Sequence, residues 1–242
     1  MNLIVEQGNT ATKVAVYQRD ELIKATVYKA FEMPDASLLF EQYPLENGIF
    51  STVRHPDKML ADILSRRLKK FLFFDDLVKL PLKISYRTPE TLGKDRIAAA
   101  VGAHYLHPEG DVLVIDAGTA ITYEIVEASG HYIGGNISPG LTTRFKALHQ
   151  FTEKLPFVKE TGQVPLVGTS TETAIIAGVV NGMIYEMDGY IDAIREVYPD
   201  VFVFLTGGHS FYFEKRLKNA IFAAINLVLT GLNRILEYNV EN

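Results

Sequence analysis

Several residue types and segments are missing from this chain of 242 residues, and each absence narrows its class. It has no cysteine, which excludes disulfides, thiolate metal sites and cysteine nucleophiles. The net charge is −5 at pH 7, so we expect no nucleic-acid partner. The most apolar helical segment, residues 220–232, is shorter than the ~20 residues of a membrane helix. The chain also begins without a signal-peptide pattern, and we expect a cytoplasmic protein that does not bind membranes.

Familiar catalytic motifs are absent as well. There is no G-x-x-x-x-G-K-[ST] loop, no G-x-G-x-x-G loop and no G-x-S-x-G elbow. The six histidines show no spacing typical of metal ligands. A nucleotide site in this chain must therefore be of another type.

Periodicity and turn residues predict an α/β protein. We expect strands at 3–6, 12–17, 21–28, 81–86 and 201–206, with three more between 111 and 140. Residues 29–55 have a polar, less regular pattern. We expect helices at 56–72, from near Asp95, and at 140–151, 171–196 and 211–237.

The segment that begins the chain is repeated later in it. "LIVEQGNTATKVAVYQRDELI" aligns without a gap on "LVIDAGTAITYEIVEASGHYI", so that Glu6 falls on Asp116 and Gly8 on Gly118. Both copies place an acid at a strand end and a glycine two residues later. The repeat predicts two related halves, residues 1–110 and 111–242, with a cleft between them. Each half opens with a three-stranded meander, and the last helix can pack back on the first half.

The paired hairpins have a chemistry that suits phosphate. A turn glycine lets backbone N–H groups approach a ligand closely, and Lys13 adds a positive charge. The two acids, Glu6 and Asp116, can hold the cation that accompanies a nucleotide. The alternative for either hairpin alone is an ordinary turn with a capping acid. The matched pair favours phosphate binding.

Two further segments have a candidate role. "LTGGHS" at 205–210 joins a strand to a helix, and its glycines can let an adenosine lie against the backbone or simply connect two elements. "YRTPETLGKDRIAAAVGA" at 86–103 places Asp95 where a turn meets a helix. Asp95 suits an N-cap there, and also a general base among the polar groups Tyr86, Lys94 and Arg96.

The chain resembles type III pantothenate kinases over nearly its whole length. The resemblance rests on "EQGNT" (6–10), "GKDR" (93–96), "DAGTAITYE" (116–124), "GGNISPGL" (134–141), "TETAIIAGVVNGM" (171–183) and "TGGHS" (206–210), in that order. It departs from the family pattern at Glu6 and Glu124, where aspartate is usual, and in the end of "TGGHS".

The resemblance implies two ribonuclease-H-like halves of the actin-like ATPase type, and ATP-dependent phosphorylation of pantothenate at the start of coenzyme A biosynthesis. It implies Mg²⁺ with ATP, a monovalent cation (K⁺ or NH₄⁺) on Asp116, Asp95 as the base, and a homodimer. Pantothenate would be bound by Tyr86, Gly93, Lys94, Asp95, Arg96 and Thr171. ATP would be bound by Glu6, Gln7, Gly8, Asn9, Thr10, Ala11, Thr12, Lys13, Gly118, Thr119, Gly207 and Gly208.

Two alternatives stay open. One is an actin-like kinase for another small hydroxy acid or sugar. The other is a nucleotide-binding accessory protein, such as a transcriptional helper, which keeps the fold but has impaired catalysis.

Overall fold

The computed structural model describes residues 1–30, 33–55, 58–75, 77–160 and 162–241. The chain forms two compact units. Unit 1 contains Met1–Glu109, Val126–Gly134 and Asn226–Asn242, and unit 2 contains Gly110–Ile125 and Gly135–Ile225. The predicted halves are defined by a sequence repeat rather than by contacts, so their boundary at residue 110 stays a prediction.

Unit 1 is built on a mixed five-stranded sheet with the order β3-β2-β1-β4-β5. β1 pairs with β2 in antiparallel and with β4 in parallel orientation, and β5 continues the parallel part. The strands are β1 (Asn2–Gln7), β2 (Thr12–Gln18), β3 (Glu21–Tyr28), β4 (Asn47–Thr52) and β5 (Lys70–Phe73). The three predicted N-terminal strands are thereby confirmed.

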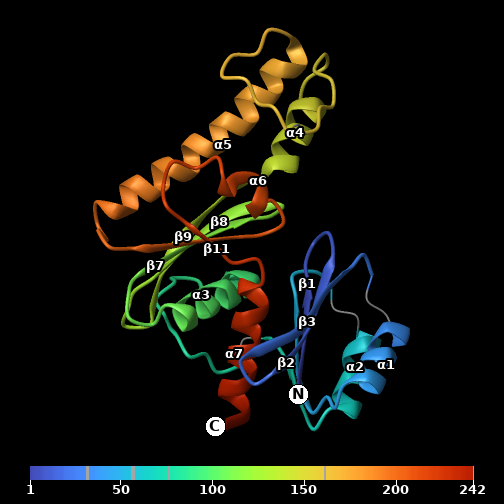
Figure 1. The fold of residues 1–242 in the computed structure, drawn as a ribbon. Helices are drawn as coiled ribbons and strands as arrows, with labels where there is room; N and C mark the ends of the chain where they lie inside the picture. Colours follow the sequence, from blue (N-terminus) through green and yellow to red (C-terminus); the bar gives the residue numbers. More distant parts are fainter. Residues whose placement is uncertain (31–32, 56–57, 76, 161, 242) are drawn as a thin grey trace. The chain divides into compact units, whose positions relative to one another are not determined.

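Helices cover both faces of this sheet, which explains why β1 is an unbroken apolar run. On one face lie α1 (Met33–Gln42) and α2 (Lys58–Arg67), whose Leu60 and Leu64 share a core with Leu3 and Val5 (Figure 1). The other face carries α7 (Leu227–Glu241), where Thr230 is hydrogen-bonded to Tyr17 of β2 (3.2 Å). α7 packs along α3 (Lys94–Leu106), which follows the short β6 (Lys83–Ile84) and η1 (Pro89–Thr91).

The sheet of unit 2 repeats the strand order of unit 1, as the sequence repeat predicts. Its order is β11-β10-β7-β8-β9-β6, in which β7, β8 and β9 correspond to β1, β2 and β3. β10 pairs in parallel with β7 and with β11, as β4 does with β1 and β5. The strands are β7 (Val112–Ala117), β8 (Ala120–Val126), β9 (His131–Pro139), β10 (Phe202–Thr206) and β11 (Phe222–Ala223). β6 pairs with His131 and Tyr132, the first residues of β9, which belong to unit 1 like β6 itself.

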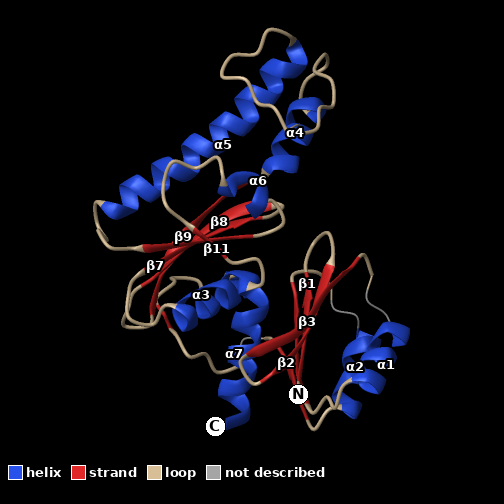
Figure 2. Ribbon diagram, viewed as in Figure 1, coloured by secondary structure: helices blue, strands red, loops and turns tan. Residues whose placement is uncertain are grey.

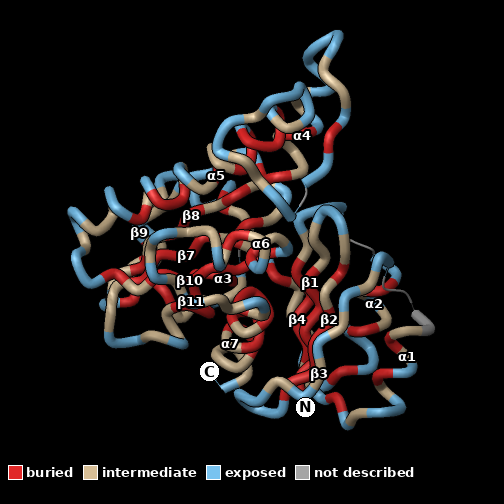
Figure 3. The backbone as a smooth tube through the Cα atoms, turned by 45° about the horizontal axis from the view of Figure 1, so that its top comes forward, coloured by how far each residue is buried: buried red, intermediate tan, exposed pale blue. Residues whose placement is uncertain are grey.

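The long helix α5 (Thr171–Arg195) lies along one face of this second sheet (Figure 2). Its Met183 and Met187 are fully buried with Leu113 and Ile115 of β7, and the strands β7 and β10 are buried along most of their length (Figure 3). The remaining helices of unit 2 are α4 (Leu141–Gln150) and α6 (Ser210–Glu214).

Three predictions of secondary structure are wrong. Residues 29–55 contain α1 and β4, and the helix predicted at 56–72 is α2 followed by β5. Residues 56–57 lie outside the described residues. The helix predicted at 211–237 is α6, then β11, then α7. No glycine or proline marks either break, and β5 and β11 become strands because they pair with β4 and β10.

In the part of the chain that the structure describes, none of the helices combines the length and the hydrophobicity needed to span a bilayer.

Candidate active site

The first candidate segment, Glu6 to Lys13, forms the end of β1, the β1–β2 turn and the start of β2. Glu6 is only 7% exposed, and Lys13 pairs with it across the ladder, with Nζ 3.8 Å from Oε2. The turn is closed by the Gly8 N–H, which donates to the Ala11 carbonyl (3.0 Å). Lys13 thus places a positive charge beside a buried carboxylate at this strand end.

The rest of this turn offers polar groups. Asn9 and Thr10 are exposed, and the Gln7 side chain accepts a hydrogen bond from the Thr52 hydroxyl (3.0 Å). Thr12 is 1% exposed, and its hydroxyl oxygen has no hydrogen-bond partner among the described residues. All eight residues predicted to bind ATP in this segment therefore lie in one hairpin.

The second candidate segment lies in unit 2, at the end of β7. Thr206 of β10 pairs with Asp116, and the next residue, Gly207, has a φ of +93°. A Cβ on Gly207 would be 2.4 Å from Asp116 Oδ1, so only glycine fits here. The His209 N–H then donates to the Ala117 carbonyl (3.0 Å). The "TGGHS" turn is thus held directly against the acid end of β7.

The structure therefore brings Asp116, Gly118, Thr119 and Gly207 together within unit 2. The other predicted glycine, Gly208, is exposed beside them. Across the described residues there is no group of three or more His, Cys, Asp or Glu that could hold a metal ion. A cation on Asp116 would need its other ligands from backbone carbonyls, water or a phosphate, which suits a monovalent ion or Mg²⁺ bound with a nucleotide.

The "GKDR" segment begins α3 in unit 1. Gly93 is the N-cap, so the prediction of Asp95 as N-cap is wrong by two residues. Asp95 stands in the first turn instead, where its Oδ1 accepts the Arg96 N–H (2.8 Å). A carboxylate is favoured at this end of a helix because the unpaired N–H groups carry partial positive charge. The start of α3 therefore holds the Asp95 carboxylate in the first turn, bonded to the Arg96 N–H.

Arg96 and Tyr86 form the second part of this motif. Arg96 is 6% exposed, and its guanidinium lies 5.7 Å from the centre of the Tyr86 ring. Tyr86 packs edge-on against Tyr132, with ring centres 6.3 Å apart. A buried guanidinium stacked on a phenol ring is a preorganised group for a carboxylate or phosphate.

Thr171 does not belong to the same unit as the other predicted pantothenate residues. It is the exposed first residue of α5 in unit 2, directly after the N-cap Ser170, whose capping box includes Thr173. Tyr86, Gly93, Lys94, Asp95 and Arg96 all lie in unit 1.

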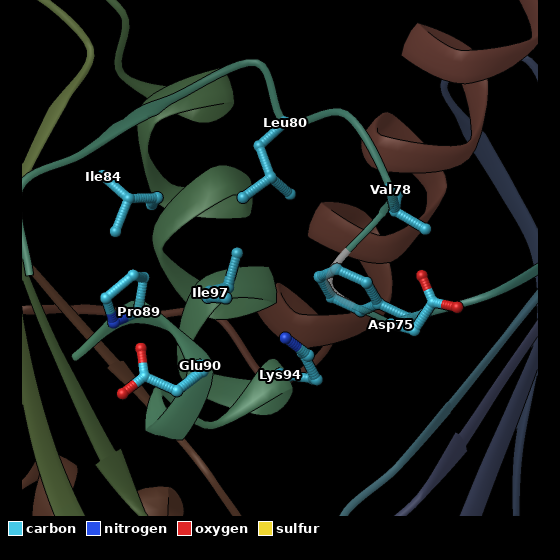
Figure 4. Close-up of a pocket in the computed structure, with 9 residues that line it drawn as sticks. Asp75, Val78, Leu80, Ile84, Pro89, Glu90, Lys94 and Ile97 are labelled. Carbon is cyan, nitrogen blue, oxygen red and sulfur yellow. The ribbon is translucent and has the colours of Figure 1, made fainter.

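Sequence reasoning missed a pocket beside the first turn of α3 (Figure 4). Its volume is about 250 Å³, and Lys94 contributes to it with Nζ 5.7 Å from the centre of the Phe74 ring. The other lining residues are Asp75, Val78, Leu80, Ile84, Pro89, Glu90 and Ile97. Apart from Ile97 of α3, they come from irregular segments and short elements, so no periodic pattern could have revealed them.

Two sheets with the same strand order, each with an acid and a glycine at its first hairpin, define an actin-like α/β fold. Solved structures agree. A protein from Campylobacter jejuni described as a Baf family transcriptional activator has a TM-score of 0.65 at 23% identity, covering 99% of this chain and 100% of its own. A protein from Sinorhizobium meliloti described as a 2-dehydro-3-deoxygalactonokinase has a TM-score of 0.58 at 13% identity, covering 99% of both chains.

The chain belongs to the type III pantothenate kinase family. The model of that family matches residues 2–193. A type III pantothenate kinase from Phocaeicola vulgatus is 47% identical over 239 residues, which cover 99% of each chain.

Proposed function

We propose that this protein transfers the γ-phosphoryl group of ATP to the hydroxyl of pantothenate, the first step of coenzyme A biosynthesis. The observation that carries the proposal is the complete Gly93–Arg96 motif at the start of α3, in a chain 47% identical to a protein named for this reaction.

Asp95 acts as the general base. It accepts the proton of the pantothenate hydroxyl as that oxygen bonds to the γ-phosphorus, while the bond from phosphorus to the β–γ bridging oxygen breaks and ADP leaves. Its hydrogen bond from the Arg96 N–H keeps the carboxylate in position. Arg96 pairs with the carboxylate of pantothenate, and Tyr86, Gly93, Lys94 and Thr171 complete the binding residues.

The two hairpins bind ATP. The residues from Glu6 to Lys13, with Gly118 and Thr119, contact the phosphates, and Gly207 and Gly208 contact the adenosine. The support is the repeat, in which backbone N–H groups and neutral side chains stand beside an acid in each copy. Mg²⁺ bound with ATP neutralises charge that develops on the phosphates.

We further propose that Asp116 holds a monovalent cation (K⁺ or NH₄⁺), and that the protein is a cytoplasmic homodimer. Gly207 packs against the Asp116 carboxylate at the end of β7. Because this carboxylate and the phosphates of ATP are both negative, a cation between them would relieve their repulsion. Large apolar side chains exposed on unit 2, including Phe151, Leu166 and Val167, are compatible with a subunit interface.

The decisive experiment incubates the pure protein with ATP, Mg²⁺, K⁺ and pantothenate, and detects phosphopantothenate by mass spectrometry. Asp95→Asn keeps the shape of the side chain but removes the base, so we expect turnover to fall by roughly 10²–10⁴-fold. Glu109→Gln, which changes an exposed carboxylate just after α3, is the matched control and should keep full turnover.

The other outcomes of this assay distinguish the proposed function from its alternatives. Unchanged turnover in Asp95→Asn would exclude Asp95 as the base. ATP binding without any product would favour the accessory protein, and a product only with a different hydroxy acid or sugar would favour the other kinase.

A further inference from the structure

A half-buried carboxylate in unit 2 gathers three hydrogen-bond donors from three different elements. Glu186 of α5 accepts from Arg144 of α4, from the hydroxyl of Ser138 of β9 and from the hydroxyl of Tyr123 of β8 (2.9 Å). Arg144 and Glu186 also form an ion pair whose side chains are 22% and 23% exposed. Tyr123 and Ser138 belong to the "DAGTAITYE" and "GGNISPGL" segments, whereas Arg144 and Glu186 lie outside every motif of the proposed reaction.

The carboxylate is ionised at neutral pH. Burial alone would raise the pKa of Glu186, but the hydrogen bonds from Arg144, Ser138 and Tyr123 outweigh it, and the pKa is lowered. Burial raises the pKa of Tyr123 most, and the negative charge of Glu186 raises it further. The Tyr123 hydroxyl therefore keeps its proton and donates it in the hydrogen bond to Glu186. Charge-assisted hydrogen bonds of this kind are roughly twice as strong as neutral ones.

Arg144 extends the cluster to the end of β9. Its Nε donates to the Pro139 carbonyl (2.7 Å), and its Nη2 also lies 3.4 Å from the Ser138 hydroxyl. One guanidinium thus joins α5, through Glu186, to the last two residues of β9. The fork of donors in arginine suits this bridge, and a lysine cannot reproduce it.

The chain just after Pro139 packs on the second hairpin. The Gly140 N–H (3.1 Å) and the Thr143 hydroxyl (2.7 Å) both donate to the Thr119 carbonyl. A Cβ on Gly140 would lie 2.2 Å from the Gly118 carbonyl oxygen, so the two backbones are in direct contact. Two donors on the Thr119 carbonyl fix the plane of the Thr119–Ala120 peptide.

We propose that Arg144 and Glu186 are positioning residues for ATP, because they hold the Pro139–Gly140 bend against the Gly118–Thr119 turn. The inference rests on the proposed function, in which this turn contacts the phosphates. A loosened bend would let the turn move, and misplacement of about 1 Å at such a site can cost 10²-fold. Pantothenate binding would be little affected, because most of its proposed residues lie in unit 1.

The test compares Arg144→Met, Thr143→Val and the double variant with the unchanged protein. We expect each single change to raise KM for ATP by up to roughly tenfold, the upper end of what one hydrogen bond contributes, and to leave KM for pantothenate within about twofold. The double variant should have about the same KM for ATP as the more impaired single variant, because both changes act on the same contact. Arg144→Lys should rescue only part of the loss.

Asp192→Asn is the matched control, since Asp192 also lies on α5 and pairs with Lys218 (2.7 Å) but does not contact the bend. It should leave both KM values unchanged. Melting curves are recorded for all variants. If Arg144→Met does not fold, Arg144→Lys still decides, because it keeps the charge beside Glu186 and removes only the fork of donors that reaches the bend.

A calorimetric titration with a non-hydrolysable ATP analogue separates this inference from the proposed function. Weaker analogue binding in the Arg144 and Thr143 variants supports positioning even if pantothenate is not phosphorylated. An active protein whose variants keep the same KM for ATP and the same affinity for the analogue would overturn the inference and leave the function standing. Additive losses in the double variant, or equal losses for ATP and pantothenate, would also overturn it. If the protein without substitutions binds no nucleotide, both the inference and the proposed function are wrong.

Discussion

Glu6 is the residue whose chemistry is least like that of an ordinary hairpin. It is buried at the end of β1, and its ion pair with Lys13 measures 3.8 Å from Nζ to Oε2, which is long for a direct hydrogen bond. It stands where the family usually has aspartate, so its carboxylate reaches about 1.5 Å further, roughly one carbon–carbon bond. Mg²⁺ accepts a narrow octahedral geometry and usually keeps several waters. We therefore expect Glu6 to act on the metal through a water.

This interpretation predicts a changed response to Mg²⁺. Glu6→Gln removes the charge but can still accept a hydrogen bond, so it should weaken Mg²⁺-dependent turnover strongly with little change in melting temperature. Glu6→Asp should stay active with a lower Mg²⁺ requirement. The measurement is a Mg²⁺ titration of initial rate, with Glu21→Gln on β3 as an exposed control. Identical titrations for all the proteins would mean that Glu6 is only a turn residue.

Among the elements, α3 and α7 pack closely, and this contact bears on the candidate site because α3 carries Asp95. A Cβ on Gly231 of α7 would lie 1.8 Å from the Ala98 carbonyl oxygen, and one on Gly102 would lie 2.4 Å from the Leu227 carbonyl oxygen. The backbones therefore touch where α7 supports α3, the helix that carries Asp95 in its first turn. Glycine here serves close approach rather than flexibility.

Gly231→Ala should force the two helices apart and lower the free energy of unfolding by about 1–3 kcal/mol, as overpacking does. The matched control is Gly178→Ala in α5, where a Cβ would meet nothing within 4 Å. That change should raise the free energy of unfolding by about 0.4–1 kcal/mol, because alanine favours a helix. Urea unfolding of both variants gives the comparison, and equal effects of the two substitutions would contradict it.

In the whole molecule, the last helix belongs to the same unit as the first strand. Leu232, Ile235 and Leu236 of α7 are fully buried, and Asn2 of β1 donates to the Asn233 side chain (2.9 Å). The Asn233 amide in turn donates to the Arg19 carbonyl (2.9 Å). Unit 1 is therefore completed only when the end of the chain has packed.

A chain ending at Ile225 should lose the cooperative folding of unit 1, because one face of its sheet and one side of α3 become exposed. We expect a larger loss of helical circular dichroism than the 15 residues of α7 explain, together with dye binding to exposed apolar surface. A chain ending at Asn239 keeps the hydrogen bonds between Asn239 and Lys79 and should melt like the full chain. Native melting of the shorter chain would show that unit 1 folds without α7.

Much of the architecture could be predicted because its signals are local. The alternation and turn residues of 3–28 and 111–140 place six strands correctly, and their alignment predicts the repeated strand order. β5 and β11 could not be predicted, since both are short and apolar and become strands only by pairing with β4 and β10. The exact start of α3 was also missed. Asp95 is a residue type favoured at the N-cap, but the N-cap is Gly93 and the helix begins at Lys94.

The sequence by itself determined the family, the fold class and the candidate residues of the motifs, because a hairpin with an acid and a glycine is written in adjacent positions. Only the tertiary structure decided which residues, distant in the sequence, support the candidate residues of these motifs. Arg144 meets Glu186 across 42 residues, and Tyr17 meets Thr230 across 213. Nothing local distinguishes these side chains from solvent-exposed ones. Their partners are fixed by how the sheets twist and how the helices pack, and these depend on the burial of the whole core.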